Sequence, residues 1–223
     1  MSEIEKRTIA AEDLYQLQLI SGSSISPDGA FVIFALHRVE EKRQKAFSNL
    51  WIADAGGQTV PRQFTCGDQN DGQPLWSPDE RRIVFVSNRA DKEQPQLYII
   101  PIDGGEGRPI TELQGSFGEV AWSPDGRRLV FSFRKKDAAD IEREADETKK
   151  ELGVVERHIT RLTYRFDGTG FLPRERRHIW LVDAESGETR QLTHFNETWM
   201  QEFDLGQVEE VWYTGPDSND LQG

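Results

Sequence analysis

The sequence predicts an all-β fold of the β-propeller class. Three observations predict it: a turn motif that recurs, a series of short β-rich segments after each copy, and a regular spacing between the copies. The motif is Ser-Pro-Asp followed by Gly or Glu, and its copies begin at Ser26, Ser77 and Ser123. Their spacings of 51 and 46 residues are close to the length of about 20–50 residues that is typical of repeat proteins, four-stranded propeller blades among them.

The turn motif has a physical basis in three of its positions. Pro presets φ, Asp bonds its own backbone, and the fourth position takes a positive φ that Gly adopts without steric cost. Gly29 and Gly126 fill the fourth position in the first and third copies, whereas the second copy has Glu80. We therefore expect the turn at Glu80 either to carry backbone strain or to adopt a different geometry.

Each repeat contains four β-rich segments. The segment after the turn lacks clean alternation, which is typical of strands buried on both faces. A segment centred on an aromatic residue follows, and a fourth segment ends in polar-apolar-Thr. Each repeat thus predicts one up-and-down sheet, and such sheets must stack to bury both faces. The segments after the turn are FVIFAL (31–36), RIVFVS (82–87) and RLVFSF (128–133).

The repeats divide the chain into a short N-terminal helix, three four-stranded blades of the WD40-like or TolB-like kind, and part of a fourth blade. Residues 7–20 have apolar residues near helical spacing, which predicts a short amphipathic helix beside the first blade. EVWYT (210–214) predicts a strand of the fourth repeat, whose turn signature is lost. The expected boundaries are 1–22 for the helical segment, 23–67, 68–115 and 116–196 for blades one to three, and 197–223 for the partial blade.

The third blade contains a long insertion, expected at about 134–177. Its acidic part, DAADIEREADETKKELG (137–153), is rich in helix formers, and Asp146 and Lys150 are spaced to pair one helical turn apart. This part predicts a solvated helix or a mobile arm. The following stretch, 154–178, is rich in aromatics and arginines. For its part Tyr164–Phe171, both a packed loop and a recognition loop fit the sequence.

Composition and charge exclude several classes of partner. With 27 Lys and Arg against 39 Asp and Glu, the net charge is −12, which disfavours a nucleic acid. No apolar run approaches the roughly 20 residues that span a bilayer, so we expect no membrane partner. The N-terminus is interrupted by charges and lacks the apolar core of a secretion signal. These features, with a single cysteine, predict a cytoplasmic protein.

A search for catalytic motifs assigns no residue to chemistry. The sequence has no G-x-S-x-G pentapeptide, no phosphate-binding glycine loop and no H-E-x-x-H. Cys66 is interpreted as a buried small residue or a loop thiol. We therefore expect no catalytic residue, no metal site and no cofactor in this chain, and the binding residues remain unassigned. The histidines are interpreted as surface or loop residues: His37, His158, His178 and His194.

Two long stretches resemble a known family. KRTIAAEDLYQLQLISGSSISPDGAFVIFAL (6–36) and RHITRLTYRFDGTGFLPRERRHIWLVDAESGETRQLT (157–193), together with the Ser-Pro-Asp repeats, resemble the N-terminal half of prolyl-oligopeptidase-type serine peptidases, in particular the acylaminoacyl-peptidase branch. The resemblance implies a propeller that caps a C-terminal α/β-hydrolase domain carrying Ser, Asp and His, and that admits short peptides but not folded proteins. No triad position carries over to this chain. The chain departs from the family pattern at two places. Ala10 stands where the family has Thr or Ser, which weakens the N-cap of the first helix, and the turn at 205–208 is lost.

The leading functional hypothesis is the non-catalytic, gating portion of a serine oligopeptidase, whose hydrolase domain is absent from this chain. The alternatives are a free-standing propeller-like module that binds a protein or peptide, and a TolB-like periplasmic protein, which the missing signal sequence disfavours. The expected partners are a peptide substrate or the hydrolase domain, with possible self-association through open blade faces. Because propellers close with four to eight blades, the ring is unfinished, as expected of a truncated gene, a split gene or an excised domain.

Overall fold

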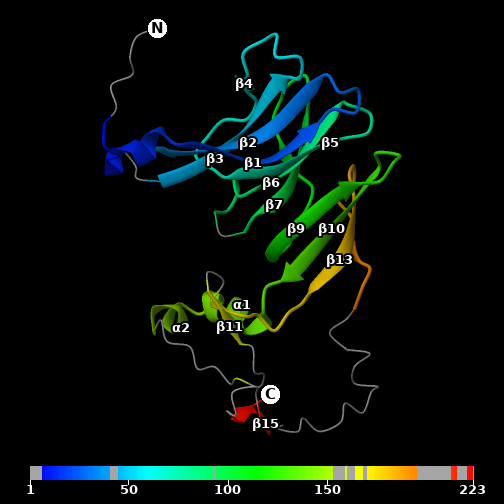
Figure 1. The fold of residues 1–223 in the computed structure, drawn as a ribbon. Coiled ribbons are helices and arrows are strands. Elements are labelled where there is room, and N and C mark those ends of the chain that lie inside the picture. The colour runs from blue at the N-terminus through cyan, green and yellow to red at the C-terminus, as the bar shows by residue number, and fades with distance from the viewer. Residues whose placement is uncertain are drawn as a thin grey trace. The chain divides into compact units, whose positions relative to one another are not determined.

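Three four-stranded antiparallel sheets follow one another along the chain in the computed structural model (Figure 1). One compact unit comprises Met1–Thr193 and a second comprises His194–Gly223. The all-β propeller-type fold expected from the sequence is confirmed. The structure describes residues 7–40, 45–92, 94–152, 159, 164–167, 170–194, 212–214 and 220–222.

Each of the three sheets pairs its strands in chain order, with the insertion falling between the second and third strands of the last sheet. We call them blades 1, 2 and 3. Blade 1 consists of β1 (Gln18–Ile25), β2 (Phe31–Glu40), β3 (Lys45–Asp54) and β4 (Arg62–Gln63). Blade 2 consists of β5 (Asp71–Trp76), β6 (Arg82–Ser87), β7 (Gln96–Pro101) and β8 (Arg108–Pro109). Blade 3 consists of β9 (Gly115–Trp122), β10 (Arg128–Lys135), β13 (Arg177–Asp183) and β14 (Thr189–Gln191).

The turns between the first two strands of each blade share one hydrogen-bond pattern. In blade 3, the Ser123 hydroxyl donates to Asp125 Oδ1 at 2.6 Å and accepts the backbone N–H of Arg128 at 3.0 Å. Glu80 has φ +60°, beside +75° for Gly29 and +66° for Gly126. The second turn therefore keeps the shared geometry, and of the two alternatives the strained backbone is confirmed.

The threonine that ends each blade has a repeated structural role. Its hydroxyl accepts the backbone N–H of the third strand in all three blades: Leu50 N to Thr65 Oγ1 at 2.9 Å, Leu97 N to Thr111 Oγ1 at 3.0 Å, and Ile179 N to Thr193 Oγ1 at 2.9 Å. The side chain thus continues the pairing where the short fourth strand ends, which explains why the polar-apolar-Thr pattern recurs.

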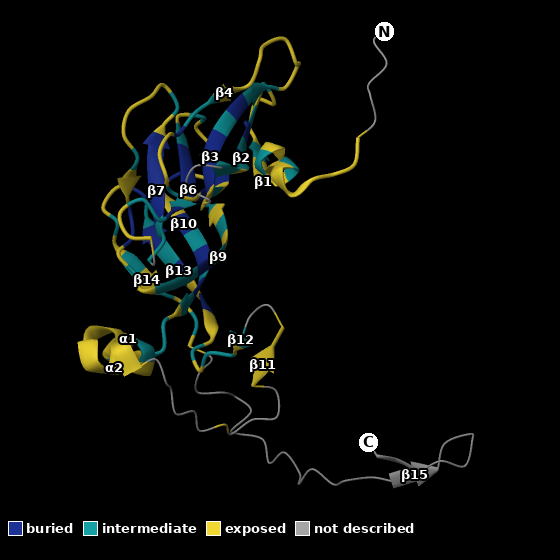
Figure 2. Ribbon diagram, turned by 90° about the vertical axis from the view of Figure 1, so that its left-hand side faces the viewer, coloured by how far each residue is buried: buried dark blue, intermediate teal, exposed yellow. Residues whose placement is uncertain are grey.

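Hydrophobic side chains fill both spaces between neighbouring blades. The buried residues lie along the central strands of the blades, such as β3, β6 and β7 (Figure 2). Blade 2 is covered on both faces: Ile83 and Phe85 pack toward blade 1, Val84 packs toward blade 3, and all three are fully buried. Burial on both faces explains why RIVFVS does not alternate between apolar and polar residues.

The N-terminal segment differs from the helix expected within residues 1–22. Among residues 7–22, which the structure describes, only η1 (Ala11–Gln16) is helical, as a 3-10 helix without buried residues. From Gln18 onward the chain forms β1, whose pairing with β2 begins at Gln18 and Arg38. The expected helix was therefore too long, because strand pairing with β2 uses the backbone groups of residues 18–20. As expected from its side chain, Ala10 makes no side-chain cap.

The insertion of blade 3 forms helices α1 (Ala138–Ala145) and α2 (Glu147–Leu152) and the short hairpin β11 (Arg165–Phe166) and β12 (Gly170–Phe171). Neither helix has a buried residue. Asp146 lies between the helices, where its carboxylate accepts the backbone N–H of Lys149 at 3.1 Å and caps α2. The acidic stretch is thus two short solvated helices, and Asp146 caps one of them where a pair with Lys150 was expected.

In the second unit, β15 (Trp212–Thr214) pairs antiparallel with β16 (Asp220–Gln222). The strand expected at 210–214 is present over Trp212–Thr214, whereas residues 197–211 of the expected partial blade lie outside the described residues. Within the described part of the chain, no helix has the length and apolar character needed to cross a membrane.

Candidate functional site

The first strands of the three blades together form a concave wall. Each has an irregularity in its pairing, between Ser21 and Ser23 in β1, between Gly72 and Leu75 in β5, and opposite Phe131 and Phe133 in β9. Such bulges re-aim a strand and are frequent beside functional sites. A hollow of about 370 Å³ is lined at this level by residues from all three strands. They are Gly22, Ser23, Gln73, Pro74, Leu75, Gly118, Glu119 and Val120.

The bulge in β5 holds an exposed side chain in a strained backbone. Gln73 has φ +51°, while the corresponding residue of β1 is Gly22 with φ +66°. A non-glycine residue in the left-handed region costs roughly 1–2 kcal/mol. This inner-strand wall combines contributions from three blades with backbone strain, and we take it as the candidate binding surface.

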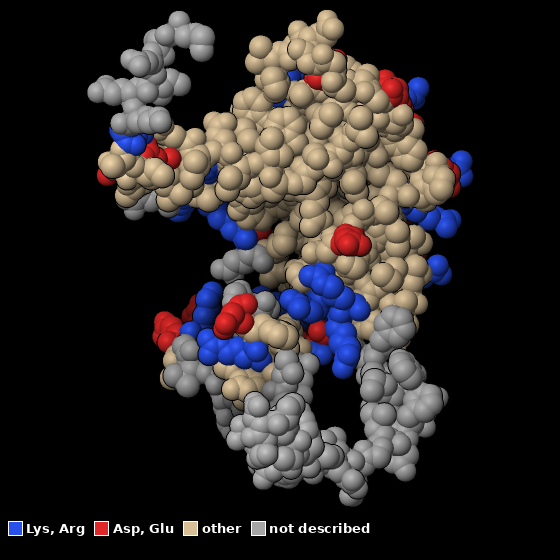
Figure 3. Space-filling view, viewed as in Figure 1, with Lys and Arg blue, Asp and Glu red and all other residues tan. Residues whose placement is uncertain are grey.

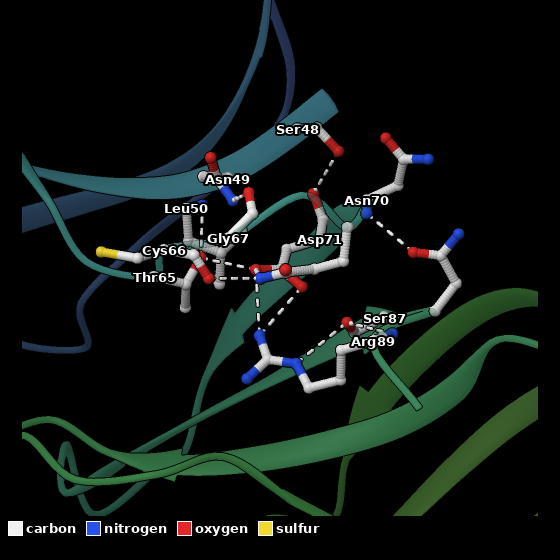
Figure 4. A network of polar contacts seen from close by, with 12 residues as sticks. Ser48, Asn49, Leu50, Thr65, Cys66, Gly67, Asn70, Asp71, Ser87 and Arg89 are labelled. Carbon is white, nitrogen blue, oxygen red and sulfur yellow. Dashed lines mark hydrogen bonds and ion pairs between the residues drawn. The ribbon is translucent and has the colours of Figure 1, made fainter. Parts of the chain in front are cut away.

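Between blades 1 and 2 lies a buried polar network centred on Asp71 (Figure 4). Asp71 is fully buried, and Arg89 Nη2 lies 2.9 Å from its Oδ1 and 3.0 Å from its Oδ2. Thr65 Oγ1 donates to Asp71 Oδ2 at 2.6 Å, and Ser48 Oγ donates to the Asp71 carbonyl at 2.8 Å. Thr65 and Ser48 belong to blade 1, so the network ties the two blades together.

Aromatic rings complete the environment of Arg89. Its guanidinium carbon lies 4.9 Å from the ring centroid of Phe85 and 5.0 Å from that of Tyr98, a cation–π arrangement. Burial raises the pKa of Tyr98, while the nearby Arg89 charge acts in the opposite direction. The carbonyl and both carboxylate oxygens of Asp71 have partners within the protein, so the network holds blades 1 and 2 together.

Blade 3 uses different residues at the same positions. Asp71 and Phe117 each lie five residues before the tryptophan that ends the first strand, and Phe133 and Lys135 correspond to Ser87 and Arg89. Phe117 packs against Phe133 with ring centroids 4.8 Å apart, and Lys135 Nζ lies 5.1 Å from the Trp180 ring centroid. Blade 3 therefore has aromatic rings at the positions where blade 2 has the buried ion pair.

The histidines that the structure describes lie in different parts of the fold. His37 Nε2 lies 2.6 Å from Ser21 Oγ between β1 and β2, His194 is exposed, and His158 lies outside the described residues. The expectation for His178 was wrong. It is buried to 4% exposure, because it shares the alternating buried face of β13 with Trp180 and Val182.

Cys66 is exposed, and its sulfur points away from Asp71 (Figure 4). Of the two interpretations of this residue, the loop thiol is correct and the buried residue is not. Among the residues that the structure describes, no three His, Cys, Asp or Glu side chains are grouped so that they could hold a metal ion.

Sequence reasoning missed both the inner-strand wall and the Asp71–Arg89 pair. The wall depends on bulges, for which the sequence offers only the glycines Gly22, Gly72 and Gly118 as weak signals. The ion pair joins residues of β5 and of the loop after β6, 18 positions apart. The corresponding residues of blade 3 are Phe117 and Lys135, so the repeat gives no sign of a conserved ion pair.

Comparison with known proteins identifies relatives of the chain. The family model described as TolB beta propeller domain matches residues 8–159. The uncharacterized peptidase YuxL of Bacillus subtilis is 29% identical over 190 residues, which are 84% of this chain and 28% of that protein.

Solved structures share the fold at low identity. Acylaminoacyl peptidase of Pyrococcus horikoshii superposes with a TM-score of 0.59 at 18% identity, over 80% of this chain and 25% of that one. The AtxE2 isopeptidase superposes with a TM-score of 0.57 at 17% identity, over 92% of this chain and 34% of that one. The chain thus spans about a quarter to a third of these proteins.

Proposed function

Because this chain belongs to the TolB β-propeller domain family, we propose that it is the non-catalytic propeller portion of a serine oligopeptidase of the acylaminoacyl-peptidase type. In this role it forms a wall of the substrate chamber and restricts access to a hydrolase domain. The observation that carries the proposal is the match to a Bacillus subtilis peptidase over 84% of this chain. That relative also confirms the resemblance to peptidases seen in the sequence.

The length of the match indicates which part of the enzyme carries the catalytic residues. The chain corresponds to 28% of the peptidase relative, and its sequence contains no G-x-S-x-G elbow for a serine nucleophile. We assign nucleophile, base and acid to a separate hydrolase domain. The contribution of this chain is then steric and electrostatic: the inner-strand wall bounds the volume in which a peptide is held.

Two exposed blade faces support a larger ring. Ile25 of blade 1 is 59% exposed, whereas Trp76, at the corresponding position of blade 2, is 8% exposed. On blade 3, Ile179 is 38% exposed, whereas the corresponding Leu97 of blade 2 is fully buried. In both cases the residue is covered where a neighbouring blade is present. We propose that three complete blades and part of a fourth belong to a closed ring.

The same faces predict the behaviour of the isolated chain. Exposed apolar surface and unpaired strand edges drive association, so we expect residues 1–223 alone to dimerise or aggregate. Size-exclusion chromatography with light scattering measures this. A monodisperse monomer that melts cooperatively and binds no hydrophobic dye would contradict the open ring.

Enzyme assays test the proposed function itself. We expect no turnover of a chromogenic aminoacyl substrate by residues 1–223. A longer product of the same locus should hydrolyse short peptides but spare folded proteins, with inhibition by a serine-directed reagent. Serine-inhibitor-sensitive turnover by the 223-residue chain itself would refute the assignment. Peptide binding by the chain, with no hydrolase encoded beside it, would favour the free-standing binding module.

A further inference from the structure

Two arginines lie directly opposite each other at the insertion end of blade 3. Arg134 of β10 pairs in register with Arg177 of β13, and also with Ser116 of β9. Residues paired in this way point to the same face of an antiparallel sheet. The three side chains therefore form one row across the blade, on the face opposite the aromatic cluster of Phe131 and Phe133.

Arg177 reaches across this row to the first strand. Its Nη1 donates to the Ser116 carbonyl at 3.3 Å, and its Nη2 lies 3.5 Å from Ser116 Oγ. The guanidinium occupies the space beside Gly118, where an added Cβ would lie 2.7 Å from Nη1. Gly118 also lines the hollow of the inner-strand wall. The absence of a side chain at Gly118 thus lets the arginine lie against that wall.

Neither guanidinium has a carboxylate partner among the residues that the structure describes. Like charges placed directly opposite each other in a sheet are destabilising, so the arrangement costs energy that no internal ion pair offsets. Burial lowers the pKa of Arg177, and the positive charge of Arg134 lowers it further. The row is an uncompensated positive site in a chain whose net charge is −12.

A small cavity adjoins the row. It has a volume of about 200 Å³ and is lined by Ser116, Arg134, Lys135 and Lys136, by Gln94 of blade 2 and by residues of the insertion. Arg177 is not among its lining residues, so the cavity meets the row at Ser116 and Arg134. Two carboxylates also line it, and both are engaged: Asp137 accepts the backbone N–H groups of Arg174 and Glu175 at 2.9 Å each, and Asp140 pairs with Arg143 at 3.4 Å. Figure 3 shows Lys and Arg side chains gathered between the blade sheets and the insertion.

We propose that Arg134 and Arg177 bind the carboxylate of a peptide at the insertion end of blade 3. The planar guanidinium fork matches a carboxylate in geometry and in charge. This proposal rests on the proposed function, and within it the pair gives the substrate chamber a preference for peptides with a free C-terminus or an acidic side chain.

Binding of N-acetylated tripeptides to the purified chain tests the proposal. The probes are N-acetyl-trialanine with a free carboxylate, its C-terminal amide, and the amide in which the central residue is Glu. We expect the free acid to bind more tightly than the neutral amide, with an affinity that falls as salt screens the charges. Binding of the Glu amide identifies side-chain recognition, and binding of the free acid alone identifies recognition of the C-terminus.

Variants locate the site. Arg134→Gln and Arg177→Gln should each weaken binding of the free acid about tenfold or more, because a charge-assisted bond is lost. Arg190→Gln, on the outer strand β14 of the same blade, is the matched control and should bind as the wild type does. Arg177→Lys keeps the charge but loses the fork, so it should bind with intermediate affinity, and it serves if the Gln variants do not fold.

The outcomes separate this proposal from the proposed function, because binding needs no hydrolase domain. Equal binding of the free acid and the neutral amide would overturn the carboxylate site. So would an equal loss in the Arg190→Gln control, or unchanged binding in the Arg134 and Arg177 variants. Carboxylate binding without peptidase activity in any longer product would leave the site standing and refute only the chamber role.

Discussion

Glu80→Gly should stabilise the protein. Glu80 holds φ +60° at the turn position that Gly29 and Gly126 occupy in the sister blades. Its side chain has no hydrogen bond or ion pair among the described residues, so nothing that the structure shows is lost when it is removed. The change therefore acts on the backbone of the turn alone.

The magnitude follows from two opposing terms. Relief of a left-handed non-glycine residue is worth about 1–2 kcal/mol, whereas glycine makes the unfolded chain more flexible and costs about 0.4–1 kcal/mol. The net gain in unfolding free energy should be about 0.5–1 kcal/mol. For a unit of this size, this raises the melting temperature by roughly 1–4 °C.

Two controls isolate the backbone term. Glu80→Ala removes the charge and most of the side chain but keeps the Cβ, so it should give little of the gain. Gly29→Ala should destabilise the first turn by a comparable amount, because an added Cβ there meets no atom within 4 Å and only the φ of +75° opposes it.

The assay is thermal and urea unfolding of the three variants beside the wild type. An unchanged or lower melting temperature for Glu80→Gly would refute the reasoning, because it would show that the positive φ at this turn carries no strain. An equal gain in Glu80→Ala would place the effect in the side chain and not in the backbone.

Three further predictions follow from the structure. The serine hydroxyl of each turn lowers the pKa of the turn aspartate, which is Asp28, Asp79 or Asp125, so on acidification the unfolded chain takes up protons before the folded chain does. The stability of the protein should therefore fall as the pH drops below about 4. Circular dichroism should show a steeper fall for the wild type than for a variant in which all three aspartates are changed to Asn. Limited proteolysis should cut first within 137–151, whose helices bury no residue, and a first cut inside a blade strand would contradict this. Asp71→Asn should lower the unfolding free energy by about 3 kcal/mol because Arg89 loses its partner. The double change Asp71→Phe with Arg89→Lys, which copies blade 3, should recover part of that loss, and equal losses in single and double variants would show that the pair is not coupled.

The blade architecture could be predicted because its signals are local. The turn motif fixes its own hydrogen bonds within six residues, and the strand after it reports burial on both faces through its composition. Glu80 shows how far such reasoning extends: the sequence predicted the position at which strain was possible, and the structure selected between strain and a changed turn.

The contacts between blades could not be predicted, because they depend on residues far apart in the chain. Asp71 and Arg89 look like ordinary surface charges in the sequence, and only the stacking of blades buries Asp71 completely. The prediction for His178 was wrong for the same reason: it is buried on the face of β13 that packs against blade 2, and the arginines directly before it in the sequence suggest an exposed position. The predicted length of the N-terminal helix was wrong because residues 18–20 pair with β2, although their apolar residues have helical spacing.

The exposed face of blade 3 has an apolar part and a positively charged part, and the two parts differ in whether a following blade can cover them. Toward its turn end this face is apolar, with Val130 and Leu181 in register with each other. At its insertion end it carries Arg134 and Arg177, where the corresponding residues of blade 2 are Asn88 and Pro95. A following blade can bury the apolar part as blade 3 buries the face of blade 2. It cannot bury two unpaired arginines without supplying carboxylates, because an uncompensated buried charge costs several kcal/mol. Where a following blade supplies no carboxylates, the insertion end of the face stays hydrated or binds an anion. A propeller ring can then close around blade 3 while its arginine pair remains accessible to a peptide.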